Sequence, residues 1–264
     1  MTETTVVELQ RAWRALQAGV FTNPPPNDDA TDAQARKWVP EAAERVLPVV
    51  GATRGTGATV LALALATVAA PARVVECTGL VTAGLVAAPT AELGVRGSWV
   101  RGSRTDVIIE RLQDTWTDPT RVPFPPLLDR ISRLTVLDVS WDPTLLLSTS
   151  TWLTQVLADA PAVVVVGTAT VPGLRRLENV MGLLGAARCV ATVLGPPVRR
   201  WPRTLALGTQ LKGLAAAGRL LELPVVPRLQ LAGIDADDLP ASLLTAAQRV
   251  LTATELDPRA KETP

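Results

Sequence analysis

The chain of 264 residues contains no histidine and no tyrosine. A catalytic arrangement of the Ser-His-Asp or Cys-His type is therefore excluded, and so is a histidine metal site. Cysteine is rare as well, since Cys77 and Cys189 are the two cysteines and lie far apart in apolar surroundings. Such thiols are typical of buried residues in a reducing compartment rather than of a disulfide or a zinc site.

A strong excess of one charge and a long apolar run are also lacking. The formal net charge is +1, which argues against a protein built mainly to coat nucleic acid. The longest apolar stretch, residues 60–72, is shorter than the roughly 20 residues that a membrane span needs. The first residues mix acidic and polar side chains into apolar positions, unlike a signal peptide. We therefore expect a cytoplasmic protein without a membrane span.

The beginning of the chain predicts an appendage. Residues 4–20 carry an apolar stripe at helical spacing, which is typical of an amphipathic helix. The stripe consists of Val6, Leu9, Trp13, Leu16 and Val20. A proline-rich linker follows, so residues 1–44 are expected either to pack on their own domain or to dock on a partner. We expect an α/β domain over 45–252 and a flexible tail over 253–264.

From residue 46 onward, short β-branched runs alternate with helical patterns. The expected strands are 46–51, 73–77, 134–139, 162–167, 189–194 and 220–226. The expected helices are 57–70, 145–159, 172–186, 204–217 and 239–253. Strands that are apolar throughout are typical of a parallel sheet covered on both faces. The sequence therefore predicts a doubly wound, mostly parallel sheet with helices on both faces. The irregular segment 94–128 is expected to add an edge strand. We expect the second strand beside the first, with 134–139 also close to it.

The loop after the first strand, GATRGTGAT, is the strongest motif of the sequence. It follows the carboxyl end of a strand and opens a helix, where backbone N–H groups bind phosphate. The stretch VVGATRGTG resembles the glycine-rich turn of short-chain dehydrogenases. That resemblance implies a catalytic tyrosine with a nearby lysine, and the absence of tyrosine excludes such catalysis. A non-catalytic NAD(P)-binding sensor stays open as an alternative.

The same loop also resembles the P-loop of the ParA/MinD ATPases, Lys-Gly-Gly-x-Gly-Lys-Thr. Positions 53–59 read T-R-G-T-G-A-T, so Gly55, Gly57 and Thr59 match. RLTVLDVSWDP is similar to the Walker B strand of that family, which makes Asp138 the expected residue of the Mg²⁺ shell. LLELPVVPRLQLAG resembles the strand and loop that contact adenine. The resemblance covers roughly residues 45–252 and implies a P-loop NTPase-like fold, ATP and Mg²⁺.

The departures from this family are as informative as the matches. Ala58 stands in place of the P-loop lysine, and Thr53 in place of the signature lysine that reaches across a dimer. Glu76 follows near the position of the second-strand acidic residue, without the family's Asp-x-Asp-Pro pattern. The Asn of the base-recognition motif is replaced within GPPVRR. The resemblance thus implies a degenerate site, with Thr59 and Asp138 toward the metal. The expected nucleotide-binding residues are Gly51, Arg54, Gly55, Thr56, Gly57, Ala58 and Thr59.

These observations lead to three hypotheses on function. The first is a pseudo-ATPase that acts as a scaffold or regulatory partner and binds ATP weakly or not at all. The second is a slow Mg-dependent ATPase in which Arg54 or a partner supplies the missing charge. The third is the NAD(P) sensor. The expected partner is a second copy of the chain or a ParA-type relative. DNA is a further candidate partner, through the cluster of Arg199, Arg200 and Arg203 around Trp201.

Overall fold

The structure, a computed structural model, describes residues 37–40, 44–78, 83–114, 116–128 and 132–256. The expected helix 4–20 and nearly all of its linker lie outside the described residues, as does most of the expected tail. Among the described residues, no helix is long and apolar enough to cross a membrane.

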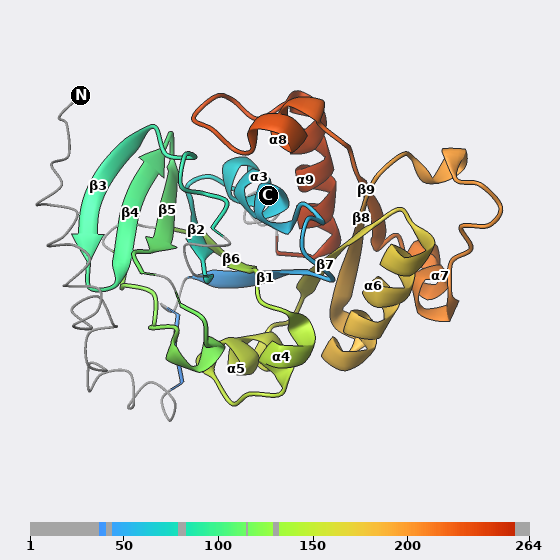
Figure 1. Cartoon of the computed structure of the whole chain (residues 1–264), viewed down its shortest axis with the longest axis horizontal. Coiled ribbons are helices and arrows are strands. Elements are labelled where there is room, and N and C mark those ends of the chain that lie inside the picture. The colour runs from blue at the N-terminus through green and yellow to red at the C-terminus, as the bar shows by residue number, and fades with distance from the viewer. Residues whose placement is uncertain (1–36, 41–43, 79–82, 115, 129–131, 257–264) are drawn as a thin grey trace, which may run out of the picture.

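The described strands form a single nine-stranded sheet (Figure 1). Its order is β3-β4-β5-β2-β6-β1-β7-β8-β9. Each neighbouring pair in the series β5-β2-β6-β1-β7-β8-β9 is parallel, whereas β4 is antiparallel to both β3 and β5. The strands are β1 (Arg45–Gly51), β2 (Ala72–Glu76), β3 (Ala91–Arg96), β4 (Trp99–Arg104), β5 (Val107–Leu112), β6 (Leu134–Val139), β7 (Val163–Thr168), β8 (Cys189–Leu194) and β9 (Leu220–Leu223). The predicted doubly wound, mostly parallel sheet is confirmed.

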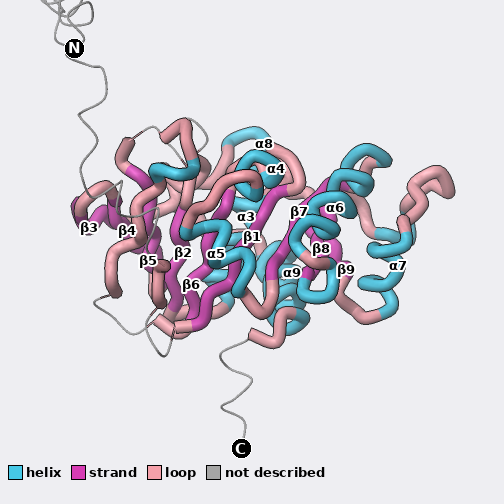
Figure 2. The backbone as a smooth tube through the Cα atoms, turned by 90° about the horizontal axis from the view of Figure 1, so that it is seen from below, coloured by secondary structure: helices cyan, strands magenta, loops and turns pink. Residues whose placement is uncertain are grey.

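Helices cover both faces of the sheet (Figure 1). One face carries α3 (Ala58–Val68), α8 (Pro227–Ala232) and α9 (Ala241–Ala253). The other carries α4 (Pro143–Leu147), α5 (Trp152–Asp159), α6 (Val171–Leu184) and α7 (Thr209–Ala216). Figure 2 shows α5 and α6 in front of the strands. Short 3₁₀ turns are η2 (Pro119–Arg121), η3 (Ala186–Arg188) and η4 (Val198–Arg200).

The hydrophobic core has one layer on each side of the sheet. Helix α3 is apolar on nearly every side, and it packs on β1, β6 and α9. Its buried surface fixes the amino-terminal end of the helix at the carboxyl end of β1. The fold thereby holds the glycine-rich loop on a rigid support.

Two predictions about the sheet are wrong. The second strand, β2, does not lie beside β1, because β6 lies between them. Both β2 and β6 are buried throughout, so their apolar patterns carry no information on which is central. The segment 94–128 contributes parts of three strands rather than a single edge strand.

Buried charges explain why the sequence pattern missed these strands. Arg101 of β4 and Arg73 of β2 both bind Glu110 of β5, with N···O distances of 2.8 and 3.1 Å. Arg73 also donates to Glu44 at 2.7 Å. The side chains of this network are almost completely buried. Charged residues at core positions break the apolar alternation by which strands are recognised.

The helix predictions also need correction at their ends. The expected helix 145–159 is two helices, because Thr151 caps a new helix with a capping box. The expected strand 220–226 ends at Leu223, since Pro224 has no N–H for the sheet. Helix α7 begins at Thr209 rather than at 204, and α8 was not predicted.

Candidate functional site

The loop between β1 and α3 has a backbone that requires glycine. Gly55 and Gly57 have φ angles of 73° and 82°, in the left-handed region that other residues rarely adopt. A Cβ atom at Gly51 would lie 2.9 Å from Oγ1 of Thr56 and 3.0 Å from the carbonyl oxygen of Thr53. The three glycines therefore shape one tight cradle in front of the amino-terminal end of α3. Helix N–H groups at such an end favour an anion.

A pocket of about 410 Å³ opens over this cradle. Its lining includes every residue predicted for nucleotide binding, together with residues that follow β6. The lining residues are Gly51, Thr53, Arg54, Gly55, Thr56, Gly57, Ala58, Thr59, Val60, Ser140, Trp141, Asp142 and Pro143. The structure thus brings the predicted loop residues together, and their role toward a nucleotide stays a prediction.

Asp138 ends β6 beside β1 and is completely buried. Its Oδ1 accepts a hydrogen bond from Oγ of Ser140 at 2.7 Å, and Ser140 Oγ lies 3.4 Å from Oγ1 of Thr59. Burial raises the pKa of Asp138 to about 6, although hydrogen bonds from Ser140 and Thr59 oppose the shift. Oδ2 has no hydrogen-bond partner. The two residues predicted toward the metal therefore lie on either side of the Ser140 hydroxyl.

Glu76 ends β2 and is the register partner of Asp138 on the neighbouring strand. Its Oε1 accepts hydrogen bonds from the backbone N–H groups of Gly84 and Leu85, at 2.5 and 3.1 Å. Burial, with the nearby charge of Asp138, raises the pKa of Glu76 to about 8. The two N–H groups and Arg111 act in the opposite direction. Its second oxygen, Oε2, is buried without a partner. The two carboxyl groups form a buried pair.

Three residues of this region were not singled out from the sequence. Ser140 and Trp141 follow Asp138 at the carboxyl end of β6. Ligands bind at the carboxyl ends of strands in such sheets, so this position could have indicated both residues from the sequence. The indole N–H of Trp141 donates to the carbonyl of Cys77 at 2.5 Å, which fixes one wall of the pocket. Arg111 lies on β5 in register with Glu76. It belongs to a strand that the sequence pattern did not reveal.

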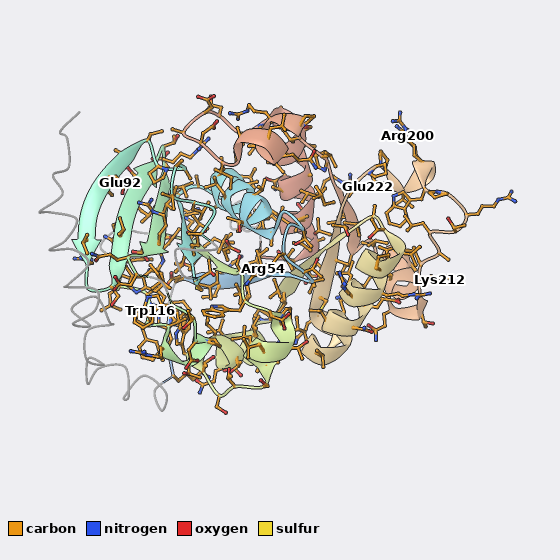
Figure 3. The ribbon with its side chains drawn as sticks, viewed as in Figure 1. Arg54, Glu92, Trp116, Arg200, Lys212 and Glu222 are labelled. Carbon is orange, nitrogen blue, oxygen red and sulfur yellow. The ribbon has the colours of Figure 1, made fainter. Side chains whose placement is uncertain are left out.

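A second pocket, of about 550 Å³, lies beyond the ends of β8 and β9. Residues of GPPVRR and of LLELPVVPRLQLAG meet there, as the resemblance implies for the nucleobase region. Glu222 accepts a hydrogen bond from the N–H of Val198 at 2.7 Å and lines this pocket together with Arg200. Figure 3 shows both residues well to one side of Arg54. Arg199 and Arg203 are exposed and do not line the pocket.

The strand order distinguishes between the two families that the glycine-rich loop resembles, the short-chain dehydrogenases and the ParA/MinD ATPases. In the dinucleotide-binding fold the second strand lies beside the first. In this chain β6 lies between β1 and β2, so the carboxyl ends of β6 and β1 meet at the loop. That order places Asp138 next to the cradle and does not match a dehydrogenase.

Comparison with known proteins gives the same fold. No protein-family model and no curated protein sequence matches the chain. A plasmid partition protein from Borrelia burgdorferi, solved with bound AMPPNP, superposes with a TM-score of 0.51 at 11% sequence identity, over 80% of this chain and 97% of that chain. The cell division ATPase MinD of Pyrococcus furiosus gives 0.48 at 15% identity, over 80% and 98%. The MinC:MinD complex of Aquifex aeolicus gives 0.49 at 13%, over 79% and 96%. The likeness to the partition protein concerns the fold alone: this chain has the fold of the ParA/MinD-type P-loop ATPases.

Proposed function

We propose that this chain is a pseudo-ATPase of the ParA/MinD fold, a scaffold or regulatory partner that binds ATP weakly and hydrolyses it poorly or not at all. The main support for this proposal is that Ala58, which has no charge, stands in place of the P-loop lysine. It is the first residue of α3, is 8% exposed and packs in the hydrophobic core, at the place where the resemblance implies the phosphate-binding lysine. Phosphoryl transfer depends mainly on positioning and on stabilising negative charge. Removing one such stabilising group typically lowers the rate by about 10²–10³.

Other features of the site still suit a nucleotide with Mg²⁺. The glycine cradle offers backbone N–H groups to phosphate, and Arg54 is the positively charged residue among those that line the pocket. Thr59, Asp138 and Glu76 offer oxygen ligands, and the buried Oδ2 and Oε2 atoms have no partner. Oxygen is the donor that Mg²⁺ prefers, so these residues fit the ion. When bound, Mg²⁺ would neutralise part of the phosphate charge.

A slow Mg-dependent ATPase is the second candidate. It is favoured by the retained Thr59 and Asp138, which stand beside the cradle, and by Arg54, which is exposed and able to supply a cation. A partner protein could supply the charge instead. The NAD(P) sensor has no comparable support, since the strand order differs from that of the dinucleotide-binding fold.

The deciding experiment compares the wild-type chain with Ala58→Lys and, as a control of similar length without charge, Ala58→Met. ATP binding is measured by calorimetry and phosphate release by a coupled assay. We expect negligible turnover of the wild type. Ala58→Lys should raise the affinity for ATP more than the rate of hydrolysis, because Thr53 still stands in place of the signature lysine and supplies no positive charge. Ala58→Met should raise neither the affinity nor the rate. Turnover of the wild type near one per second would favour the ATPase instead.

The partner of this scaffold is proposed to be a protein, either a second copy or a competent ParA-type relative. Arg199 and Arg200 of η4, with Arg203 after it, support a weaker proposal of DNA contact, because all three are exposed on one loop. Sedimentation of the chain with and without ATP tests self-association.

A further inference from the structure

A pocket of about 310 Å³ lies at the edge of the sheet opposite the glycine-rich loop. It is formed by the amino-terminal end of β1, by α5 and by the turn that leads from α5 into β7. More than half of its lining residues are apolar, Trp38, Val46, Val156, Pro161 and Leu256 among them. Strand β1 has seven residues, so roughly 20 Å separate this pocket from the glycine cradle. The pocket is therefore distinct from the candidate nucleotide site.

The chain is fixed at the rim of this pocket where its described part begins. Trp38 is 7% exposed, and its ring lies edge-on to that of Trp152 on α5, with the ring centroids 5.5 Å apart. Lys37 Nζ forms an ion pair with Oδ2 of Asp159 at 2.5 Å, and both residues line the pocket. Residues 1–36, which lie outside the described residues, therefore join the domain at the pocket itself.

The two ends of the chain differ in what they offer to an apolar pocket. Leu256 lines the pocket and is followed by residues 257–264, DPRAKETP, of which four are charged. Residues 4–20 instead carry the apolar stripe with Trp13 at its centre. Removing such a stripe from water is favourable, whereas removing charges is costly. Of these two segments, the one that contains Trp13 matches the lining.

The pocket also holds an acceptor that lacks a donor. Gln155 on α5 lines the pocket, and its Oε1 is buried without a hydrogen-bond partner among the described residues. A buried carbonyl oxygen of this kind costs stability unless a donor reaches it. An indole combines a large apolar ring with one N–H donor, which is usually bonded when it is buried. Trp13 therefore suits both the apolar lining and this acceptor.

We propose that residues 4–20 dock as an amphipathic helix on this pocket of the same chain, with Trp13 inserted between β1 and α5. Residues 21–36 connect this segment to Lys37 and span about 50–60 Å when fully extended. A helix of 17 residues is about 25 Å long, so the connection allows the helix to return to the pocket. The tether makes the contact intramolecular and independent of protein concentration. This inference goes beyond the proposed function, because the contact needs neither nucleotide nor a partner.

The first test compares the full chain with Trp13→Ala. Thermal unfolding should show a Tm lowered by about 4 °C or more, equally at low and high protein concentration. Hydrogen exchange should become faster in peptides that cover α5 and stay unchanged in those that cover α6, because only α5 would lose its cover. Arg11→Ala is the matched control, since Arg11 lies on the opposite side of the predicted helix, and it should behave as the wild type does.

A pocket variant tests whether the two surfaces meet. Val156→Glu places a charge in the lining, so in this background Trp13→Ala should lower the Tm no further, as expected for residues in contact. Leu183→Glu, at a 59% exposed leucine of α6, is the matched control, and in its background Trp13→Ala should keep its full effect. If Val156→Glu does not fold, the exchange of α5 in Trp13→Ala decides.

Two results would overturn the proposal. An unchanged Tm with unchanged exchange of α5 in Trp13→Ala would leave the stripe for a partner protein. Sedimentation distinguishes the other case: a wild-type dimer that Trp13→Ala dissociates, with a Tm that depends on protein concentration, would assign the pocket to the helix of a second copy.

Discussion

Gly84 lies against Thr59 so closely that no side chain fits between them. A Cβ atom at position 84 would be 2.9 Å from Cγ2 and 3.7 Å from Oγ1 of Thr59. The same turn donates the N–H groups of Gly84 and Leu85 to Glu76. One turn therefore contacts the side chain of Thr59 and holds the carboxyl group of Glu76 in place.

Gly84→Ala should push this turn away from Thr59. We expect a loss of about 1–3 kcal/mol of stability, as for overpacking in a core. Chemical denaturation measures this loss. Gly213→Ala is the control, because Gly213 lies inside α7 with nothing within 4 Å of its Cβ position. That variant should be stabilised by up to about 1 kcal/mol. Equal behaviour of the two variants would contradict the close approach of Gly84 to Thr59.

The carboxyl pair predicts how stability depends on pH in the metal-free protein. Burial raises the pKa of Glu76 to about 8 and that of Asp138 to about 6, so the folded state holds protons that the unfolded state releases. Their contribution is fully present below the unfolded pKa values, near pH 4, and is lost as pH rises through 6 and 8. Urea denaturation in EDTA should therefore show stability falling from pH 5 to pH 9.

Glu76→Gln is the control for this pH dependence, because the amide can still accept from Gly84 and cannot ionise. The variant should flatten most of the slope above pH 6 and be more stable than the wild type at pH 9. An unchanged slope in Glu76→Gln would show that other groups cause the dependence.

The buried network beneath β4 and β5 predicts a large loss of stability on removal of one charge. Glu110→Gln removes the carboxylate that binds both Arg101 and Arg73. Breaking such a buried pair typically costs about 3–5 kcal/mol. The shift of the denaturation midpoint measures this loss of stability. Asp159→Asn, which removes the exposed pair with Lys37, should change stability by no more than about 1 kcal/mol. Similar small effects in both variants would show that the network contributes little.

The exposed arginines make a separate prediction about DNA. Replacing Arg199, Arg200 and Arg203 together by alanine should weaken DNA binding and reduce its salt dependence. The slope of log K against log salt concentration should fall by about one for each phosphate that an arginine no longer neutralises. Fluorescence anisotropy with a labelled duplex at several salt concentrations measures both quantities. Arg175→Ala with Arg176→Ala is a matched control on the exposed face of α6. If the wild type shows no salt-dependent binding at low ionic strength, DNA is not a partner.

The sequence by itself determined the fold class and indicated the loop at which the candidate site is proposed. Runs of Val and Leu with no polar interruption, as in β7, require a sheet buried on both faces. Gly55 and Gly57 stand where the backbone has positive φ, and Thr59 and Asp138 were singled out because their segments resemble motifs of the ParA/MinD ATPases. These features lie within short segments of the chain, so they can be recognised before any tertiary contact is known.

Only the tertiary structure decided which strands are neighbours. The insertion of β6 between β1 and β2 distinguishes the P-loop fold from the dehydrogenase fold, and two equally apolar strands give no sign of it. It also makes Glu76 and Asp138 register partners, although they are far apart in the sequence. Strands β3 to β5 stayed hidden because Arg101 and Glu110 compensate each other's charge only after the chain has folded. Pairing of buried charges is a property of three-dimensional contact, which a pattern along the chain does not record.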